Sequence, residues 1–137
     1  MVALIDTNVI LDALVDREPF ATKAREILAH CSQKKFSGYF AGHTIPDIFY
    51  ILRKDYSIVQ RKDMLLGVCR TMDVVGIDKS MLIDALTNGK FDDVEDCLQA
   101  ECAASIGADY IITRNTTDFF ASPIPAITPE EFLAKYL

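Results

Sequence analysis

Short, strongly apolar runs alternate with segments of helical periodicity along the whole chain, and this alternation constrains the fold more than any other feature. The runs are three to six residues long and rich in Val, Ile, Phe and Tyr, which is typical of buried strands. We predict strands at Val2–Ile5, Phe36–Ala41, Val74–Ile77, Tyr110–Ile112 and Ala126–Thr128. Strands separated by helices favour an open parallel sheet with right-handed crossovers, so we expect a three-layer α/β fold.

The helices between these strands carry recognisable start and stop signals. We predict them at 7–14, from Pro19, from His43 to about Lys54, at 58–72, 78–86 and 94–106, and after Thr128. Asp78 is expected to cap the fifth helix, and Gly107 to end the sixth. Thr128-Pro129-Glu130-Glu131 matches a capping box, which predicts the start of the last helix.

The length and composition fit a single globular domain over residues 1–137. No apolar run approaches the roughly 20 residues of a membrane span, and no secretory signal is evident, so we expect a cytoplasmic protein. The four cysteines form no CxxC pair, and the two histidines lack zinc-site spacing, so reduced thiols are expected. The net charge of −6 disfavours non-specific nucleic-acid binding and suits a site that attracts cations.

Polar residues follow two of the predicted strands directly. Asp6 ends the first strand, and the segment Thr113-Arg114-Asn115-Thr116-Thr117-Asp118 follows the strand at 110–112. Because ligands of open parallel sheets bind beyond the carboxyl ends of the strands, we expect both segments at one ligand site.

Two further acids lie near predicted helix starts, at Asp47 and Asp96. Asp96 shares a helix face with Gln99, whereas Glu95 points about 100° away, toward solvent. Clustered carboxylates repel one another unless a cation joins them, and hard Mg²⁺ or Mn²⁺ prefers such oxygens. Neutral oxygens of Asn8, Thr113 and Asn115 are candidates to orient the acids.

Each acid also has a purely structural interpretation, because acids are common at helix starts and turns. Asp47 could complete a capping box with Thr44, and Asp96 follows Asp93 at the same spacing. Asp118 could cap a short turn, and Asp6 could form an Asx-turn with Asn8. Asp12 and Asp16 are interpreted as the polar face of the first helix. No single acid is specific; the ordered set is the informative feature.

Four stretches together resemble the PIN domain family: ALIDTNVILD, TIPDIFYILRK, FDDVEDCLQAECA and ADYIITRNTTDF. The resemblance spans nearly the whole chain. It implies a stand-alone domain with a parallel sheet, a homodimer, and cleavage of RNA that depends on Mg²⁺ or Mn²⁺. Many small members are VapC-like toxins paired with an antitoxin protein, so a toxin–antitoxin role is also implied.

Carried onto this chain, the resemblance makes Asp6, Asp96 and Asp118 metal ligands and catalytic acids. Asp47 would act as an outer ligand or a base, Thr113 and Asn115 would orient the last acid or a water, and Arg114 would contact RNA. Two positions depart from the family pattern. Asp47 stands where Glu is common, and Asn115 stands where many members have Asp.

These departures favour one alternative function, an inactive PIN-like module that binds RNA or protein. A second alternative is a phosphatase or phosphotransfer receiver, which also has an acid after its first strand. That fold requires a paired acid near the start and a lysine after a late strand, where this chain has Arg114.

Overall fold

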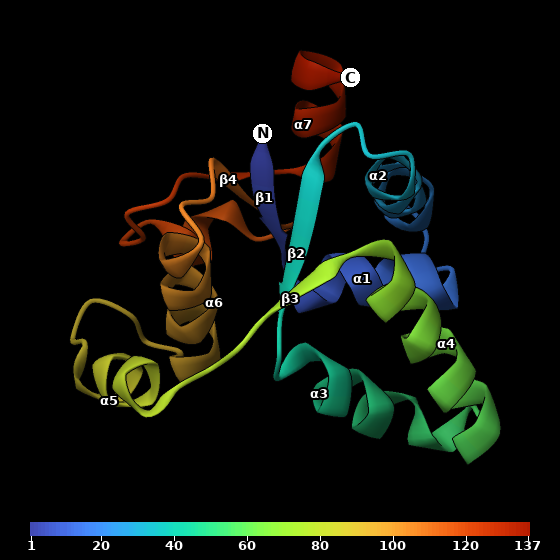
Figure 1. Ribbon diagram of the computed structural model, residues 1–137, viewed down its shortest axis with the longest axis horizontal. Coiled ribbons are helices and arrows are strands. Elements are labelled where there is room, and N and C mark those ends of the chain that lie inside the picture. The colour runs from blue at the N-terminus through green and yellow to red at the C-terminus, as the bar shows by residue number, and fades with distance from the viewer.

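The computed structural model describes all 137 residues and has a five-stranded parallel sheet at its centre (Figure 1). The strands lie in the order β3 (Asp73–Val75), β2 (Ser37–Ala41), β1 (Val2–Ile5), β4 (Tyr110–Ile112) and β5 (Ala126–Ile127). The N-terminal strand therefore occupies the middle, with Leu4 opposite Tyr39 on one side and Ile111 on the other. The predicted parallel α/β sheet is confirmed, and only β3 is displaced toward the N-terminus from its expected position.

Helices cover both faces of this sheet and complete the three layers. One face carries α1 (Thr7–Val15), α2 (Ala21–Ser32), α3 (Thr44–Ile51), α4 (Ile58–Thr71) and α7 (Pro129–Tyr136). The other carries α5 (Lys79–Thr87) and α6 (Val94–Ser105). Two short 3-10 turns, η1 (Leu52–Lys54) and η2 (Thr116–Phe119), complete the chain.

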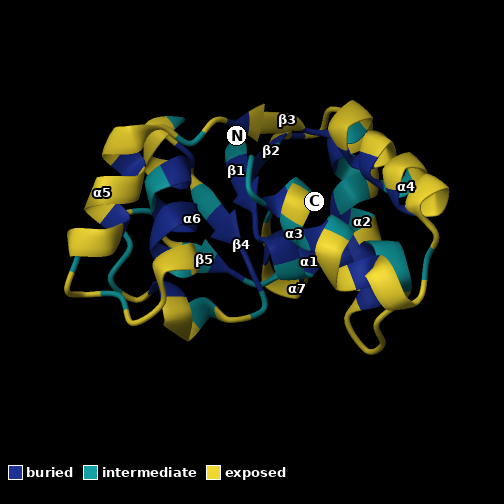
Figure 2. Ribbon diagram, turned by 90° about the horizontal axis from the view of Figure 1, so that it is seen from below, coloured by how far each residue is buried: buried dark blue, intermediate teal, exposed yellow.

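The strands bury alternate side chains on opposite faces, which produces two separate cores (Figure 2). Ile5 and Ile112 pack into the larger core under α1, α2 and α7, whereas Leu4 and Ile111 pack against α6. This alternation is the two-residue period of a β-strand, seen here in strands that are apolar on both faces.

Local capping signals behave largely as the sequence predicts. Thr128 and Glu131 form the expected capping box of α7, Asp78 caps α5, and Gly107 has the positive φ of 61° that ends α6. The Thr44 and Asp47 capping box does not form, because α3 begins at Thr44 itself and has no side-chain cap. Asp47 is therefore left free of that structural role.

The apolar faces of α3 and α4 are only partly buried, since Ile51 is 44% and Leu66 is 48% exposed. Ile48, Leu52, Leu65 and Val68 are each at most 4% exposed. All four cysteines are free thiols, and three of them are buried. None of the helices combines the length and the apolar character needed to cross a membrane.

Candidate metal centre

Asp6 lies at the point where β1 leaves the sheet and α1 begins, and its carboxylate is buried. Its backbone N–H donates to the carbonyl of Ile112 at 3.0 Å, which continues the ladder between β1 and β4. The hydroxyl of Thr113 donates to Asp6 Oδ2 at 2.8 Å, and Gln99 Nε2 lies 3.4 Å from Oδ1. Burial raises the pKa of Asp6, and the hydrogen bond from Thr113 partly opposes that rise.

A buried polar network fixes the side chains around Asp6. Gln99 Nε2 also donates to Thr7 Oγ1 at 3.1 Å, and Thr7 shares a 2.8 Å hydroxyl hydrogen bond with Thr44. These residues come from α6, α1 and α3, and each is at most 5% exposed. The network joins three helices at the carboxyl edge of the sheet and leaves Gln99 Oε1 without a hydrogen-bond partner.

Asp96 lies in the first turn of α6, beside this network. The carboxylate of Asp93 caps the helix by accepting from the backbone N–H groups of Glu95 and Asp96, so Asp96 itself is not needed as a cap. Burial, followed by the negative charges of Asp93, Asp118 and Asp6, raises the pKa of Asp96 to about 7. An acid that lies in a surface hollow and has so strongly shifted a pKa is a candidate functional group.

Asp118 reaches the same place from η2, the turn that follows β4. Asp96 and Asp118 line one surface hollow of about 360 Å³, together with Asp92, Asp93 and Thr117. Asp96 and Asp118 therefore share one hollow, and the negative charge of Asp6 also raises the pKa of Asp96.

Asp47 belongs to a neighbouring group of side chains in the first turns of α3 and α6. His43, Asp47 and Glu95 each offer one ligand atom, and these atoms all lie within 4.8 Å of one another. His43 Nε2 is 3.6 Å from Glu95 Oε1. Burial and the charge of Glu95 raise the pKa of Asp47. The Glu95 side chain, expected to point to solvent, is half-exposed and turns toward His43 and Asp47.

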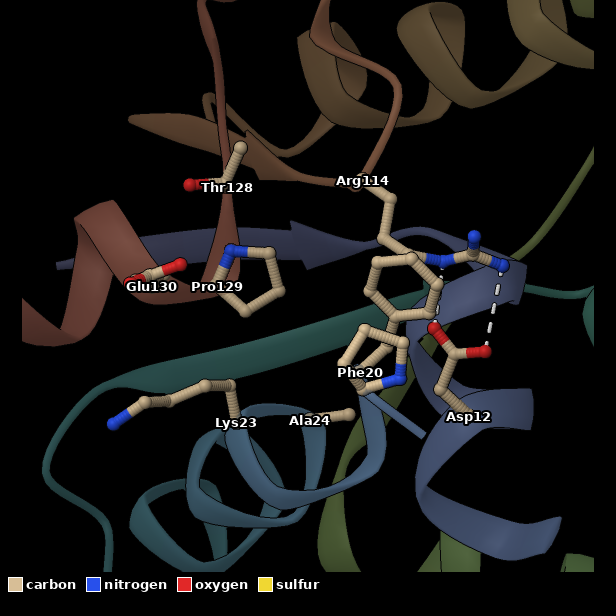
Figure 3. A pocket seen from close by; sticks show the side chains of 9 residues that line it. Asp12, Phe20, Lys23, Ala24, Arg114, Thr128, Pro129 and Glu130 are labelled. Carbon is tan, nitrogen blue, oxygen red and sulfur yellow. Dashed lines mark hydrogen bonds and ion pairs between the residues drawn. The ribbon is translucent and has the colours of Figure 1, made fainter. Parts of the chain in front are cut away.

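No lysine or arginine forms an ion pair with Asp6, Asp47, Asp96 or Asp118. Arg114, which lies in the same segment as Asp118, pairs with Asp12 instead, with Arg114 Nε 2.7 Å from Asp12 Oδ2 (Figure 3). Asp12 was expected on the polar face of α1, but it is 0% exposed, so that prediction is wrong. The site therefore combines several carboxylates with no lysine or arginine ion-paired to them, although Lys90 lines the same hollow as Asp96 and Asp118.

The predicted orienting residues have different environments. Thr113 holds Asp6, and its Oγ1 also accepts the Asn115 backbone N–H at 3.1 Å. The side chains of Asn8 and Asn115 form no hydrogen bond with another residue. The Asp6 carboxylate does not cap α1 by a side-chain hydrogen bond, so the Asx-turn considered for Asp6 and Asn8 does not form. The roles of Asn8 and Asn115 toward an ion remain predictions.

Gln99, His43 and Glu95 were not predicted as site residues. Gln99 carried a usable signal, because it shares a helix face with Asp96 at i, i+3 spacing. His43 and Glu95 meet only because α3 and α6 converge at the sheet edge, and sequence spacing gives no sign of that.

The fold matches a known class of α/β protein. The family model described as PIN domain matches residues 2–117. The chain therefore belongs to the PIN domain family. No curated protein sequence matches it.

Solved structures share the fold at low sequence identity. VapBC2 from Rickettsia felis, bound to a DNA fragment from their promoter, superposes with a TM-score of 0.69 and 15% identity, over 93% of this chain and 98% of that one. FitAcB from Neisseria gonorrhoeae gives 0.64 and 18%, over 93% and 98%. VapC20 from Mycobacterium tuberculosis, a Sarcin-Ricin loop cleaving toxin, gives 0.64 and 8%, over 98% and 96%.

Proposed function

We propose that this chain is an endoribonuclease that depends on Mg²⁺ or Mn²⁺ and hydrolyses phosphodiester bonds in RNA. The observation that carries this proposal is that Asp96 and Asp118 line one hollow, with the charge of Asp6 acting on Asp96, and that none of the three acids has a basic ion-pair partner. Without a cation, burial and mutual repulsion make the ionised form of these acids costly, as the raised pKa values of Asp6 and Asp96 indicate. A hard divalent cation removes that cost, because carboxylate oxygens are its preferred ligands.

The donor set fits such an ion, with Asp6, Asp96 and Asp118 as ligands. When bound, a divalent ion supplies positive charge to a phosphate oxygen and lowers the pKa of a water molecule. Thr113 keeps Asp6 oriented and favours its ionised form. Asp47, set beside His43 and Glu95, is placed to act as an outer ligand or to accept a proton from the attacking water. Asn8 and Asn115 are proposed to orient these groups.

The proposal extends to a toxin role in the cytoplasm, a homodimer and an antitoxin protein that inhibits the enzyme. Membership in the PIN domain family supports the nuclease assignment. The likeness in fold to VapC20, a Sarcin-Ricin loop cleaving toxin, supports RNA as the substrate. The likeness to VapBC2 supports an antitoxin partner.

The experiment is cleavage of a single-stranded RNA by the purified protein, with Mn²⁺, with Mg²⁺ and with a chelator. We expect cleavage only with the cations and its loss in Asp6→Asn. Asp63→Asn is a matched control, because Asp63 is an exposed acid on α4 with no ion-pair partner. Cleavage that survives Asp6→Asn would count against this site.

The alternative, an inactive module that binds RNA or protein, draws on Asp47 and Asn115, which depart from the family pattern. It predicts RNA binding without cleavage and no effect of Mn²⁺ on the melting temperature. The same purified protein therefore distinguishes the two functions.

A further inference from the structure

Arg114 is held in place by two residues of the α1 and α2 region. Its Nε lies 2.7 Å from Asp12 Oδ2, and its Nη2 donates to Asp12 Oδ1 at 3.4 Å. Its guanidinium carbon lies 4.3 Å from the centre of the Phe20 ring, within the range of a cation–π contact. Figure 3 shows the guanidinium joined to the Asp12 carboxylate by dashed lines, with the Phe20 ring beside them. All three residues line a cavity of about 170 Å³.

Arg114 belongs to the segment that carries the last acids of the candidate centre. Thr113, its neighbour, donates to Asp6, and the Asn115 N–H donates back to Thr113. The Asp118 N–H then donates to the Asn115 carbonyl at 3.1 Å. A displacement of Arg114 therefore shifts both the residue that orients Asp6 and the turn that presents Asp118.

From this geometry we infer that Asp12 is a positioning residue for the metal centre: through Arg114 it fixes the segment 113–118 against α1. The inference rests on the proposed function for its consequence in catalysis. It gives Arg114 a different role from the RNA contact that the sequence predicts.

The environment of Asp12 explains why Arg114 stays with it. Asp12 is 0% exposed, and Arg114 is its only ion-pair partner. Moving Arg114 to an RNA phosphate would leave a buried carboxylate unpaired, which is strongly unfavourable. Burial raises the pKa of Asp6, and the charge of the anchored guanidinium is a minor influence that opposes this rise.

The first test is hydrogen exchange of the segment 113–120, measured by mass spectrometry without RNA. In Asp12→Asn we expect exchange in this segment at least tenfold faster than in the wild type, with the β2 and α4 peptides unchanged. The matched control is Asp16→Asn, which breaks the exposed pair between Asp16, the residue that follows α1, and Arg25 on α2. Unchanged exchange in Asp12→Asn would overturn the inference.

The second test separates positioning from RNA contact by kinetics. A positioning role predicts that Asp12→Asn and Arg114→Gln each lower kcat at least tenfold, with KM within twofold of the wild type. It also predicts that the double variant is no worse than either single one. A raised KM with unchanged kcat in Arg114→Gln would make Arg114 an RNA contact and overturn the inference.

Arg114→Lys tests the positioning role if the Asp12→Asn variant does not fold. Lysine keeps the positive charge beside Asp12 but loses the second donor and the stacking on Phe20. We expect faster exchange confined to 113–120 in this variant, and wild-type exchange would overturn the inference. If the wild type cleaves no RNA, the proposed function fails, while the exchange experiment still tests the role of Asp12.

Discussion

Asp96→Asn should make the metal-free protein more stable at pH 8, although it alters a residue of the proposed active site. The ordinary pKa of an aspartate is 3.8, and in the folded protein that of Asp96 is about 7. The folded state therefore binds the Asp96 proton more tightly than the unfolded state. In the wild type the free energy of unfolding should fall as pH rises from about 4 to about 7, and then level off.

The size of the effect follows from the same two values. Each pH unit between them corresponds to roughly 1.4 kcal/mol, so the full difference gives roughly 4 kcal/mol. The carboxyl group is partly accessible to solvent, which screens the repulsion, so about 2 kcal/mol is the appropriate expectation. Asparagine cannot ionise, and the variant should gain that amount at pH 8 and almost nothing at pH 4.

Urea denaturation of the wild type and of Asp96→Asn, with chelator, at pH 8, 6 and 4.5, measures this difference. Added Mn²⁺ should stabilise the wild type by linkage and leave the variant nearly unchanged. Asp63→Asn removes an exposed charge on α4 and should stay within about 0.5 kcal/mol of the wild type at each pH. A variant that is less stable than the wild type at pH 8, or a difference that does not vary with pH, would refute the reasoning.

Three further predictions concern positions fixed by packing or hydrogen bonding. Thr113→Val removes the hydroxyl that donates to buried Asp6, so we expect a loss of about 1–3 kcal/mol by urea denaturation and a weaker response to Mn²⁺ in calorimetry. Gly38→Ala places a methyl carbon 2.3 Å from Cys31 Sγ, so the free energy of unfolding should fall by about 1–3 kcal/mol. Adding Cys31→Ala should restore part of this loss, and an unchanged melting temperature in Gly38→Ala would contradict the prediction. Gly67→Ala, within α4 and with no atom within 4 Å of the new carbon, should stabilise the protein by about 0.5–1 kcal/mol, and a loss would show that the open space is wrongly assigned.

Sequence periodicity was enough for the fold because β1, β4 and β5 are continuous apolar runs and several helices carry their own start or stop signals. The order of the strands along the sheet could not be predicted in this way. Nothing in Val2–Ile5 indicates that β1 lies between β2 and β4, since that placement depends on how both faces are covered by helices. The position of β1 is nevertheless what brings Asp6 beside Thr113.

The site was predictable only where it follows strand ends. Asp6 and Asp118 could be placed together because parallel strands share a carboxyl edge. The burial of Asp12 could not be predicted, because the helix pattern places Asp12 on the same polar face as exposed Asp16. Asp12 is buried against Arg114 because α1 packs beside the segment that follows β4. The contact of His43 with Glu95 likewise joins helices separated by much of the chain.

The hydrogen bond between Asp6 and Thr113 spans 107 positions of the chain. During synthesis, Asp6 is therefore made long before Thr113. Until β4 is made, β1 lacks one of its two neighbouring strands. Under the proposed function, a growing chain would have no assembled nuclease centre until the segment through Asp118 had been synthesised and folded. Under the same proposal, the late arrival of that segment would leave every unfinished copy unable to cleave RNA.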